Sequence, residues 1–180
     1  MGAPQALLIE NSMKIGVLSD THLRSPNPVL EHILEELLAD TEMILHAGDI
    51  VSRQVLDRLE MDGVMAVCGN MDDHEVAQAI PQVRSIPAVG KRIALIHGWG
   101  SKDRLEQRIL GHFQNDKPDL IVYGHSHVPF WGEVDGVLMF NPGSARQSGH
   151  SEGGTVGLIE IIDGNISARI LSVKQSTSSY

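Results

Sequence analysis

Seven side chains of the types that bind metal ions each follow shortly after an apolar run in the sequence. They are Asp20, His22, Asp49, Asn70, His97, His125 and His127. Two carboxylates, four imidazoles and one amide oxygen suit borderline divalent ions such as Mn, Fe, Zn, Ni or Co better than Ca. Seven ligands are too many for one tetrahedral ion, but they fit two ions that share a carboxylate and a bridging hydroxide. The residue types therefore predict a two-metal centre.

The intervals between these residues match repeated strand–helix–strand units. Asp49 lies 29 residues after Asp20, and the next steps, to Asn70, His97 and His125, are 21, 27 and 28 residues. Parallel strands joined by such crossovers end at one edge of a sheet, where open α/β folds bind their ligands. We therefore expect segments that are far apart in the sequence to converge on one pocket.

Each of these residues taken alone has a simpler interpretation. Asp and Asn are common at strand ends because they suit turns, and a single His is often a hydrogen-bonded structural residue. The pairs Asp20/His22 and His125/His127 are harder to explain as turns, because residues i and i+2 share a face of an extended chain. The pairs, and the order of all five motifs after apolar runs, favour the metal-site interpretation.

The apolar pattern predicts the elements that would position these residues. Strands are expected at 14–18, 43–45, 64–67, 92–96, 120–123, 130–134, 137–140, 155–162 and 166–173. Helices are expected at 28–39, 52–60 with Ser52 as N-cap, and 101–115. The stretch 81–87 shows no clear pattern, and hairpin loops are expected at 135–136 and 163–165. Strand–helix alternation followed by hairpins indicates a mixed sheet or a two-sheet α/β sandwich.

The length of 180 residues and an apolar fraction of 42% fit one globular domain. We place this domain at 13–173, after a loose N-terminal extension at 1–12 and before a frayed tail at 174–180. The single cysteine, Cys68, allows no intramolecular disulfide and is expected to be a packed thiol. No run is long enough to span a bilayer and the start lacks a secretory signal, so we expect a cytoplasmic protein without a membrane partner.

The net charge of −9, with no run of five or more basic residues, argues against binding to long nucleic acids. A phosphate would nevertheless be attracted if two divalent ions outweighed the charges of Asp20 and Asp49. Neutral His and Asn ligands would leave that positive charge uncancelled. The composition therefore argues against a broad nucleic-acid surface and is compatible with a metal site that attracts a small phosphate-bearing molecule.

The five motifs resemble the signature of the calcineurin-like metallophosphoesterases. They are Ser-Asp-Thr-His at 19–22, Gly-Asp at 48–49, Gly-Asn at 69–70, His-Gly at 97–98 and Gly-His-Ser-His at 124–127. In size, and in Gly-Asn-Met-Asp at 69–72, the chain resembles the small bacterial and archaeal phosphodiesterases of that superfamily, which are relatives of the retromer subunit Vps29. The resemblance covers 13–173 and implies a four-layer α/β/β/α sandwich of two mixed sheets flanked by helices.

The resemblance also implies roles for the seven residues. One metal would be held by Asp20, His22, Asp49 and His127, and the other by Asp49, Asn70, His97 and His125. Asp49 would bridge the two ions. The implied activity is that of a dinuclear-metal phosphodiesterase, in which a metal-bridging hydroxide attacks phosphorus in a small phosphoester. We expect Mn first, with Ni, Co, Fe, Zn or Mg as alternatives.

The chain departs from the superfamily pattern at Met71, where many members carry a His thought to protonate the leaving oxygen. Met71 has no proton to give, so we expect weak general-acid catalysis and a preference for good leaving groups. The alternative is that Asp72 or His74 supplies the proton. Arg146, after the turn at 141–144, is a candidate for binding the substrate phosphate, whereas the turn itself is expected to shape the floor of the metal site.

A second function class stays open, a non-catalytic protein-binding scaffold like Vps29. Met71 favours that alternative. A scaffold can lose metal ligands without penalty, yet all seven positions carry competent residues. The complete ligand set therefore favours an enzyme. A homodimer is our default expectation for the assembly.

Overall fold

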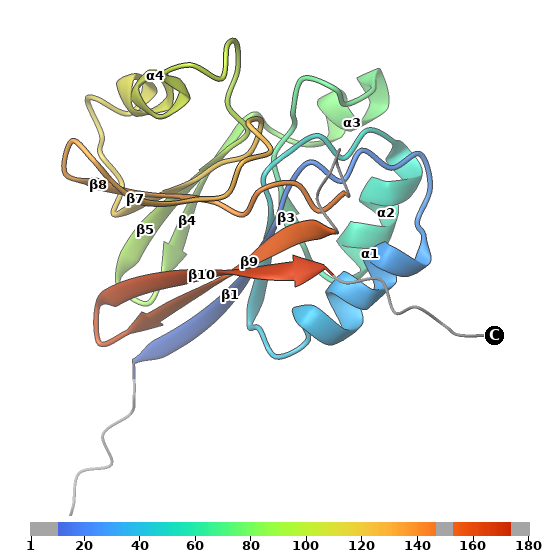
Figure 1. Cartoon of the computed structure of the whole chain (residues 1–180), viewed down its shortest axis with the longest axis horizontal. Coiled ribbons are helices and arrows are strands. Elements are labelled where there is room, and N and C mark those ends of the chain that lie inside the picture. The colour runs from blue at the N-terminus through green and yellow to red at the C-terminus, as the bar shows by residue number, and fades with distance from the viewer. Residues whose placement is uncertain (1–10, 147–152, 174–180) are drawn as a thin grey trace, which may run out of the picture.

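The computed structural model describes residues 11–146 and 153–173, and in it two five-stranded sheets lie face to face with helices on the outside (Figure 1). The first sheet has the order β10-β9-β1-β2-β3, and the second has the order β4-β5-β6-β8-β7. Both sheets mix parallel and antiparallel pairs, for example β1 with β2 and β1 with β9. The predicted four-layer sandwich is confirmed. The predicted extension and tail fall largely or wholly outside the described residues.

The first sheet carries three of the five motif strands. Its strands are β1 (Ser12–Leu18), β2 (Met43–His46), β3 (Met65–Ala66), β9 (Gly154–Ile162) and β10 (Asn165–Val173). The second sheet comprises β4 (Val83–Ala88), β5 (Lys91–Ile96), β6 (Leu120–Val122), β7 (Phe130–Val134) and β8 (Val137–Asn141). Parallel pairing of β1, β2 and β3, and of β5 with β6, gives each sheet a set of aligned carboxyl ends.

Three layers of apolar side chains hold the sandwich together. Along β1, Ile15 and Val17 pack between the sheets, whereas Leu18 packs against the helices. Along β5, Ile93 packs between the sheets and Ile96 packs toward the outer helix of the second sheet. Because side chains alternate across a strand, β1 and β5 are buried on both faces and need continuous apolar sequence. That double burial explains why both strands were predictable.

The helices begin at side-chain caps where the sequence supplies them. Asn27 caps α1 (Pro28–His32). Ser52 is the predicted cap of α2 (Arg53–Met61), and its side chain accepts from the Val55 N–H. Asp73 caps α3 (His74–Ala79). No side chain caps α4 (Leu105–His112), where Arg104 has a left-handed φ of 52°. The Ser101 hydroxyl accepts from the Asp103 N–H in a local turn, so the helix predicted at 101–115 is shorter than expected.

Two local predictions need correction. The helix predicted at 28–39 continues after α1 as a π-helix at Ile33–Leu37, and the wider turn ends with Leu38 packed against Gly16 of β1. The unpatterned stretch at 81–87 contains β4, which pairs with β5 through a tight turn at Val89 and Gly90. β4 is an edge strand, which tolerates Pro87 because its outer N–H positions need no partner.

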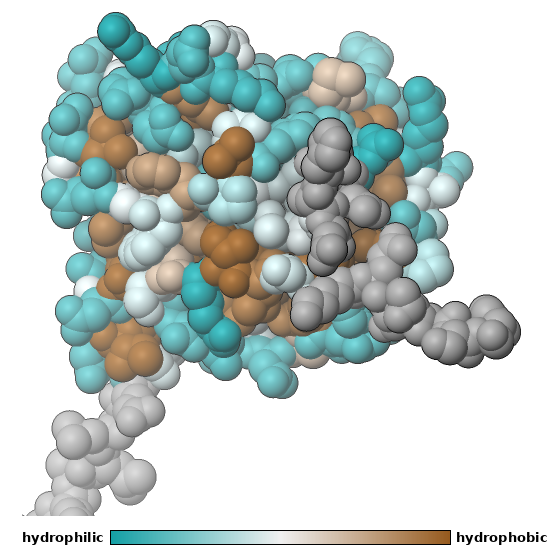
Figure 2. Space-filling view, in the orientation of Figure 1, coloured by the Kyte–Doolittle hydropathy of each residue, from teal (hydrophilic) through white to brown (hydrophobic). Residues whose placement is uncertain are grey.

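On the face shown in Figure 2, hydrophobic residues (brown) lie in small separate patches among hydrophilic ones (teal). Within residues 11–146 and 153–173, no helix is both long and apolar enough to cross a membrane.

Candidate metal centre

The seven predicted ligands lie on loops at the carboxyl ends of strands from both sheets. Asp20 and His22 follow β1, Asp49 follows β2, and His97 follows β5. Asn70 follows β3, while His125 and His127 follow β6. The expectation that one sheet would supply all of them is wrong, because the motif strands are divided between the two sheets. A hydrogen bond of 3.2 Å from the His125 N–H to Asp20 Oδ2 joins the loops of the two sheets.

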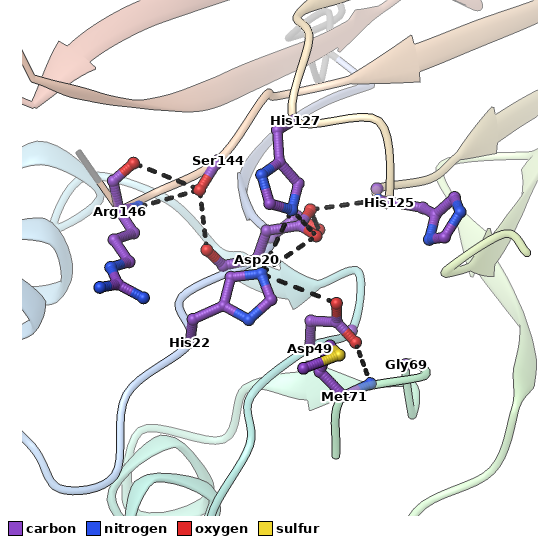
Figure 3. Close-up of polar contacts among 12 residues, drawn as sticks. Asp20, His22, Asp49, Gly69, Met71, His125, His127, Ser144 and Arg146 are labelled. Carbon is purple, nitrogen blue, oxygen red and sulfur yellow. Dashed lines mark hydrogen bonds and ion pairs between the residues drawn. The ribbon is translucent and has the colours of Figure 1, made fainter. Parts of the chain in front are cut away.

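Four of the ligands form one compact group, in which the side chains point toward one another (Figure 3). The ligating atoms of Asp20, His22, Asp49 and His127 all lie within 4.8 Å of one another. His22 Nε2 is 3.2 Å from His127 Nε2, and His127 Nε2 is 3.1 Å from Asp20 Oδ1. The set is the same as the one that the resemblance assigns to the first ion.

The other group contacts the Asp49 carboxylate through His97. His97 Nε2 is 3.4 Å from Asp49 Oδ2, which is also 3.7 Å from His22 Nε2 in the first group. His125 Nδ1 is 2.9 Å from Asn70 Oδ1, and the His97 and His125 rings meet edge to face at 5.2 Å. Asp49 therefore faces imidazoles of both groups. The assignment of these groups to two ions stays a prediction.

Two buried atoms indicate that a cation fits here. His97 Nδ1 donates to the Ala47 carbonyl at 2.7 Å, so Nε2 keeps its lone pair and faces Asp49. Among the described residues, His97 Nε2 and Asp20 Oδ1 are buried without a hydrogen-bond partner, since the contact between Asp20 Oδ1 and His127 lacks hydrogen-bond geometry. Unpartnered buried polar atoms are costly, and a divalent ion bound at each of them would remove that cost.

The protonation states of the two carboxylates also suit a cation. Burial favours the neutral form of Asp20 and Asp49, but nearby imidazoles and N–H or O–H donors outweigh it and lower the pKa of both carboxyls. Burial lowers the pKa of His22 despite the two carboxylates beside it. Burial acts in the same direction on His97, but the nearby Asp49 carboxylate, together with the charge of Asp20, prevails and raises its pKa. The carboxylates are therefore ionised when an ion arrives.

Five of the seven predicted ligands have left-handed backbone. The φ angles are 54° at Asp20, 48° at His22, 59° at Asp49, 69° at His125 and 62° at His127. Asp and His tolerate this region better than most residues, but each still carries some strain. The pairs at i and i+2 therefore lie in tight loops and not in extended chain. His125 and His127 point into different groups, so the predicted reason for their spacing is wrong.

Two motif glycines allow the loops to approach each other closely. A Cβ on Gly69 would overlap the carboxylate and the backbone nitrogen of Asp49. A Cβ on Gly124 would overlap the Ser19 hydroxyl and lie 2.8 Å from Asp20 Oδ2. The glycines of Gly-Asn and Gly-His are therefore required by packing against the two carboxylates.

His46 is not part of the ligand pattern, but its hydrogen bonds hold the loops that follow β1 and β2. The Gly48 N–H donates to His46 Nδ1 at 3.1 Å, so Nε2 carries the proton and donates to Thr21 Oγ1 at 3.1 Å. Thr21 Oγ1 in turn donates to the Asp49 carbonyl at 3.4 Å. His46 is fully buried, and this burial lowers its pKa to about 3. Its position directly before Ala47-Gly48-Asp49 was the only sequence signal for this role.

Asp72 and Met71 contact the ligand loops, whereas the other predicted proton donor, His74, is placed only by its position in α3. Asp72 Oδ1 accepts from the Val51 N–H at 2.6 Å and Oδ2 accepts from the Gly69 N–H at 2.7 Å, so both oxygens anchor ligand loops. Met71 is exposed, and its N–H donates to Asp49 Oδ1 at 2.8 Å. His74 is exposed at the start of α3. The proposed proton-donor roles of Asp72 and His74 stay predictions.

The turn at 141–144 supports the floor of the site. Ser144 Oγ donates to the Asp20 carbonyl at 2.9 Å and accepts from the Arg146 N–H at 3.2 Å. Asn141 Nδ2 donates to the Gly124 carbonyl at 2.8 Å. The exposed Arg146 side chain lies on the His22 side of the centre (Figure 3), and its role in binding substrate stays a prediction.

Two pockets lie near the centre, one beside the loop between Asp20 and His22 and the other lined by two of the ligands. One, of about 270 Å³, is lined by Thr21 and Arg146 together with apolar side chains of the loop after β1 and of the helix that follows. The other, of about 320 Å³, is lined by Asn70, His97 and Trp99. The centre therefore has room beside it for the organic substituents of a phosphoester.

We predict that Gly69→Ala weakens Mn binding about 10–100-fold, because the added methyl group displaces the Asp49 carboxylate. The matched control is Gly111→Ala in α4, where the new Cβ meets no atom within 4 Å. The control should bind Mn like the unmodified protein and be about 0.5–1 kcal/mol more stable. Calorimetric titration of both variants with Mn measures the difference, and equal affinities would contradict the packing argument.

We also predict a pH dependence of stability that originates at His46. In the unfolded chain His46 becomes protonated below about pH 6.5, whereas in the folded protein it stays neutral down to about pH 3. The free energy of unfolding therefore falls as the pH falls. In metal-free protein, His46 should lower the free energy of unfolding by about 1.4 kcal/mol when the pH falls from 7.5 to 5.5. Urea unfolding measures this decrease, which should be smaller by this amount in His46→Gln than in the unmodified protein. An unchanged loss in the variant would show that His46 is protonated in the folded protein.

The family of the chain follows from comparison with known proteins. Residues 13–164 match the model of the calcineurin-like phosphoesterase superfamily domain. A probable metallophosphoesterase of Methanothermobacter thermautotrophicus is 36% identical over 135 residues, which cover 73% of this chain and 77% of the relative. A phosphodiesterase of Methanocaldococcus jannaschii is 31% identical over 146 residues, which cover 73% of this chain and 83% of that relative.

Solved structures share the fold at lower identity. A predicted phosphoesterase of Streptococcus pneumoniae is 22% identical with a TM-score of 0.73, and the match covers 93% of this chain and 94% of that one. Vacuolar protein sorting 29 of Cryptosporidium parvum is 22% identical with a TM-score of 0.62, covering 89% and 98% of the two chains. From the domain match and the identity to its relatives, the chain belongs to the calcineurin-like phosphoesterase superfamily.

Proposed function

We propose that the protein is a dinuclear-metal phosphodiesterase that hydrolyses small phosphoesters. The position of Asp49 is the main support, because one carboxylate oxygen lies 3.7 Å from His22 Nε2 and 3.4 Å from His97 Nε2. A carboxylate that faces two groups of ligands, most of them neutral, is suited to bridge two cations. The similarity to a phosphodiesterase of Methanocaldococcus jannaschii supports the same activity.

In this proposal the two groups keep the roles that the resemblance implies. Asp20, His22, Asp49 and His127 would hold one ion, and Asp49, Asn70, His97 and His125 would hold the other. Two divalent ions bound there would supply Lewis acidity toward phosphate and a hydroxide nucleophile at neutral pH. Mn is the ion we expect first, with Ni, Co, Fe, Zn or Mg as alternatives.

The chain's own residues would orient the substrate. Imidazole and amide ligands add no negative charge, so the centre can attract a phosphate although the chain carries −9 overall. The Arg146 guanidinium, on the His22 side, is a second positive group for a phosphate oxygen. The overall acidity also favours a small substrate over long nucleic acid.

Protonation of the leaving group is the weak part of this site. Met71 offers no proton, and the N–H groups of Val51 and Gly69 occupy both oxygens of Asp72. We therefore propose that substrates whose leaving groups depart as stable anions react fastest. The nitrophenolate of bis-p-nitrophenyl phosphate is such a leaving group, which makes that diester the appropriate first substrate.

We predict that chelator-treated protein does not hydrolyse bis-p-nitrophenyl phosphate and that added Mn restores the reaction. Asp49→Asn should lower kcat/KM at least about 100-fold, because even loss of a residue that only supports a metal ligand costs 10–100-fold. The matched control is Asp40→Asn, an exposed carboxylate after the π-helix, which should keep full activity.

Nitrophenolate release, followed by absorbance, measures both variants. Absence of hydrolysis with Mn, Ni, Co, Fe, Zn and Mg, in protein that binds the ions, would contradict the enzyme proposal. That outcome would favour the alternative, a non-catalytic protein-binding scaffold.

A further inference from the structure

Trp99 is an exposed aromatic residue two positions after His97. Its side chain is 41% exposed, although a large apolar ring is usually covered in a protein of this size. The ring borders the pocket of about 320 Å³ that Asn70 and His97 also line. Exposure of a tryptophan beside candidate metal ligands is the kind of feature that serves a bound molecule.

The loop that carries Trp99 is held in place by Arg108 of α4. Arg108 Nη1 donates to the Trp99 carbonyl at 2.9 Å and to the Ser101 carbonyl at 2.8 Å. Arg108 Nη2 donates to the Asp103 carbonyl at 2.9 Å. A guanidinium that binds three carbonyls of one loop fixes its backbone, so the indole is presented by an anchored loop. Such preorganisation lowers the cost of binding a ligand.

The indole is also fixed from one side. The ring of His112 packs edge to face against Trp99, with centroids 6.0 Å apart and an interplanar angle of 75°. His112 and Gln82 both line the pocket. Gln82 carries an amide donor and an amide acceptor, and His112 can act as either. The pocket therefore combines an aromatic surface with groups that can hydrogen-bond to the edge of a polar ring.

We propose that this pocket binds a nucleobase, which stacks on Trp99 while its phosphate lies at the metal centre. The inference rests on the proposed function and names its substrate class as nucleotide phosphoesters. The volume of about 320 Å³ is at the lower end for ligand pockets and suits one ring system. Stacking accepts any base, whereas the donor and acceptor of Gln82 favour a heteroaromatic ring over a hydrocarbon one.

The test compares two ligands that differ only by the base, AMP and ribose 5-phosphate, on Mn-loaded protein. Calorimetric titration should give an affinity for AMP at least about tenfold higher, as expected for one stacked base. Trp99→Ala should reduce that advantage to about twofold or less, while Trp99→Phe should retain most of it. The matched control is Trp131→Ala, which removes a tryptophan of similar exposure, 37%, on β7 and should leave the advantage unchanged.

A second readout does not depend on the alanine variants. In a Trp131→Phe background, AMP should quench the fluorescence of Trp99, and ribose 5-phosphate should not. Equal affinities for the two ligands, failure of both to bind, or an AMP advantage that survives Trp99→Ala would each overturn the inference.

Hydrolysis of bis-p-nitrophenyl phosphate by the same Mn-loaded protein separates this inference from the proposed function. Hydrolysis without any preference for AMP would overturn the nucleobase pocket and leave the phosphodiesterase standing. An AMP preference that depends on Trp99, in protein that hydrolyses nothing with any of the metals, would support the nucleobase pocket and contradict the phosphodiesterase proposal.

Discussion

The buried carboxylate of Asp49 joins the two sheets at one end of the sandwich. It comes from the first sheet, and its Oδ2 faces His22 of that sheet and His97 of the second. Its Oδ1 accepts from the Met71 N–H, and Gly69 packs directly against it. A charge at this depth is stable only with compensating partners, so the surrounding loops are constrained to present donors or a cation to it.

That constraint is accompanied by strained backbone conformations. Asp20, His22 and Asp49 have left-handed φ, and so does Val51, where a β-branched side chain makes the conformation unfavourable. The carboxylate of Asp72 receives the N–H of Val51 and thereby holds this strained turn next to Asp49. Strain that is concentrated around ligands and stabilised by neighbouring hydrogen bonds is typical of a functional site.

Much of the fold and the convergence of the site residues could be predicted from the sequence, since both depend on local patterns, whereas the division of the ligands into two groups was implied by the family resemblance. β1 and β5 are apolar because both their faces are buried, and the ligand types recur after such strands. β4 was missed because Pro87 interrupts its pattern, although an edge strand accepts it. The anchoring of Trp99 by Arg108 was also missed, because contacts between a loop carbonyl and a helix side chain leave no periodic signal.

The number of ions at the centre tests the account most directly. Calorimetric titration of chelator-treated protein with Mn, combined with elemental analysis of the loaded protein, gives ions bound per chain. The account predicts two ions in the unmodified protein and one in His97→Ala, whose missing ligand belongs only to the group of Asp49, Asn70 and His125. Binding of one ion or none by the unmodified protein would contradict a dinuclear centre built around Asp49.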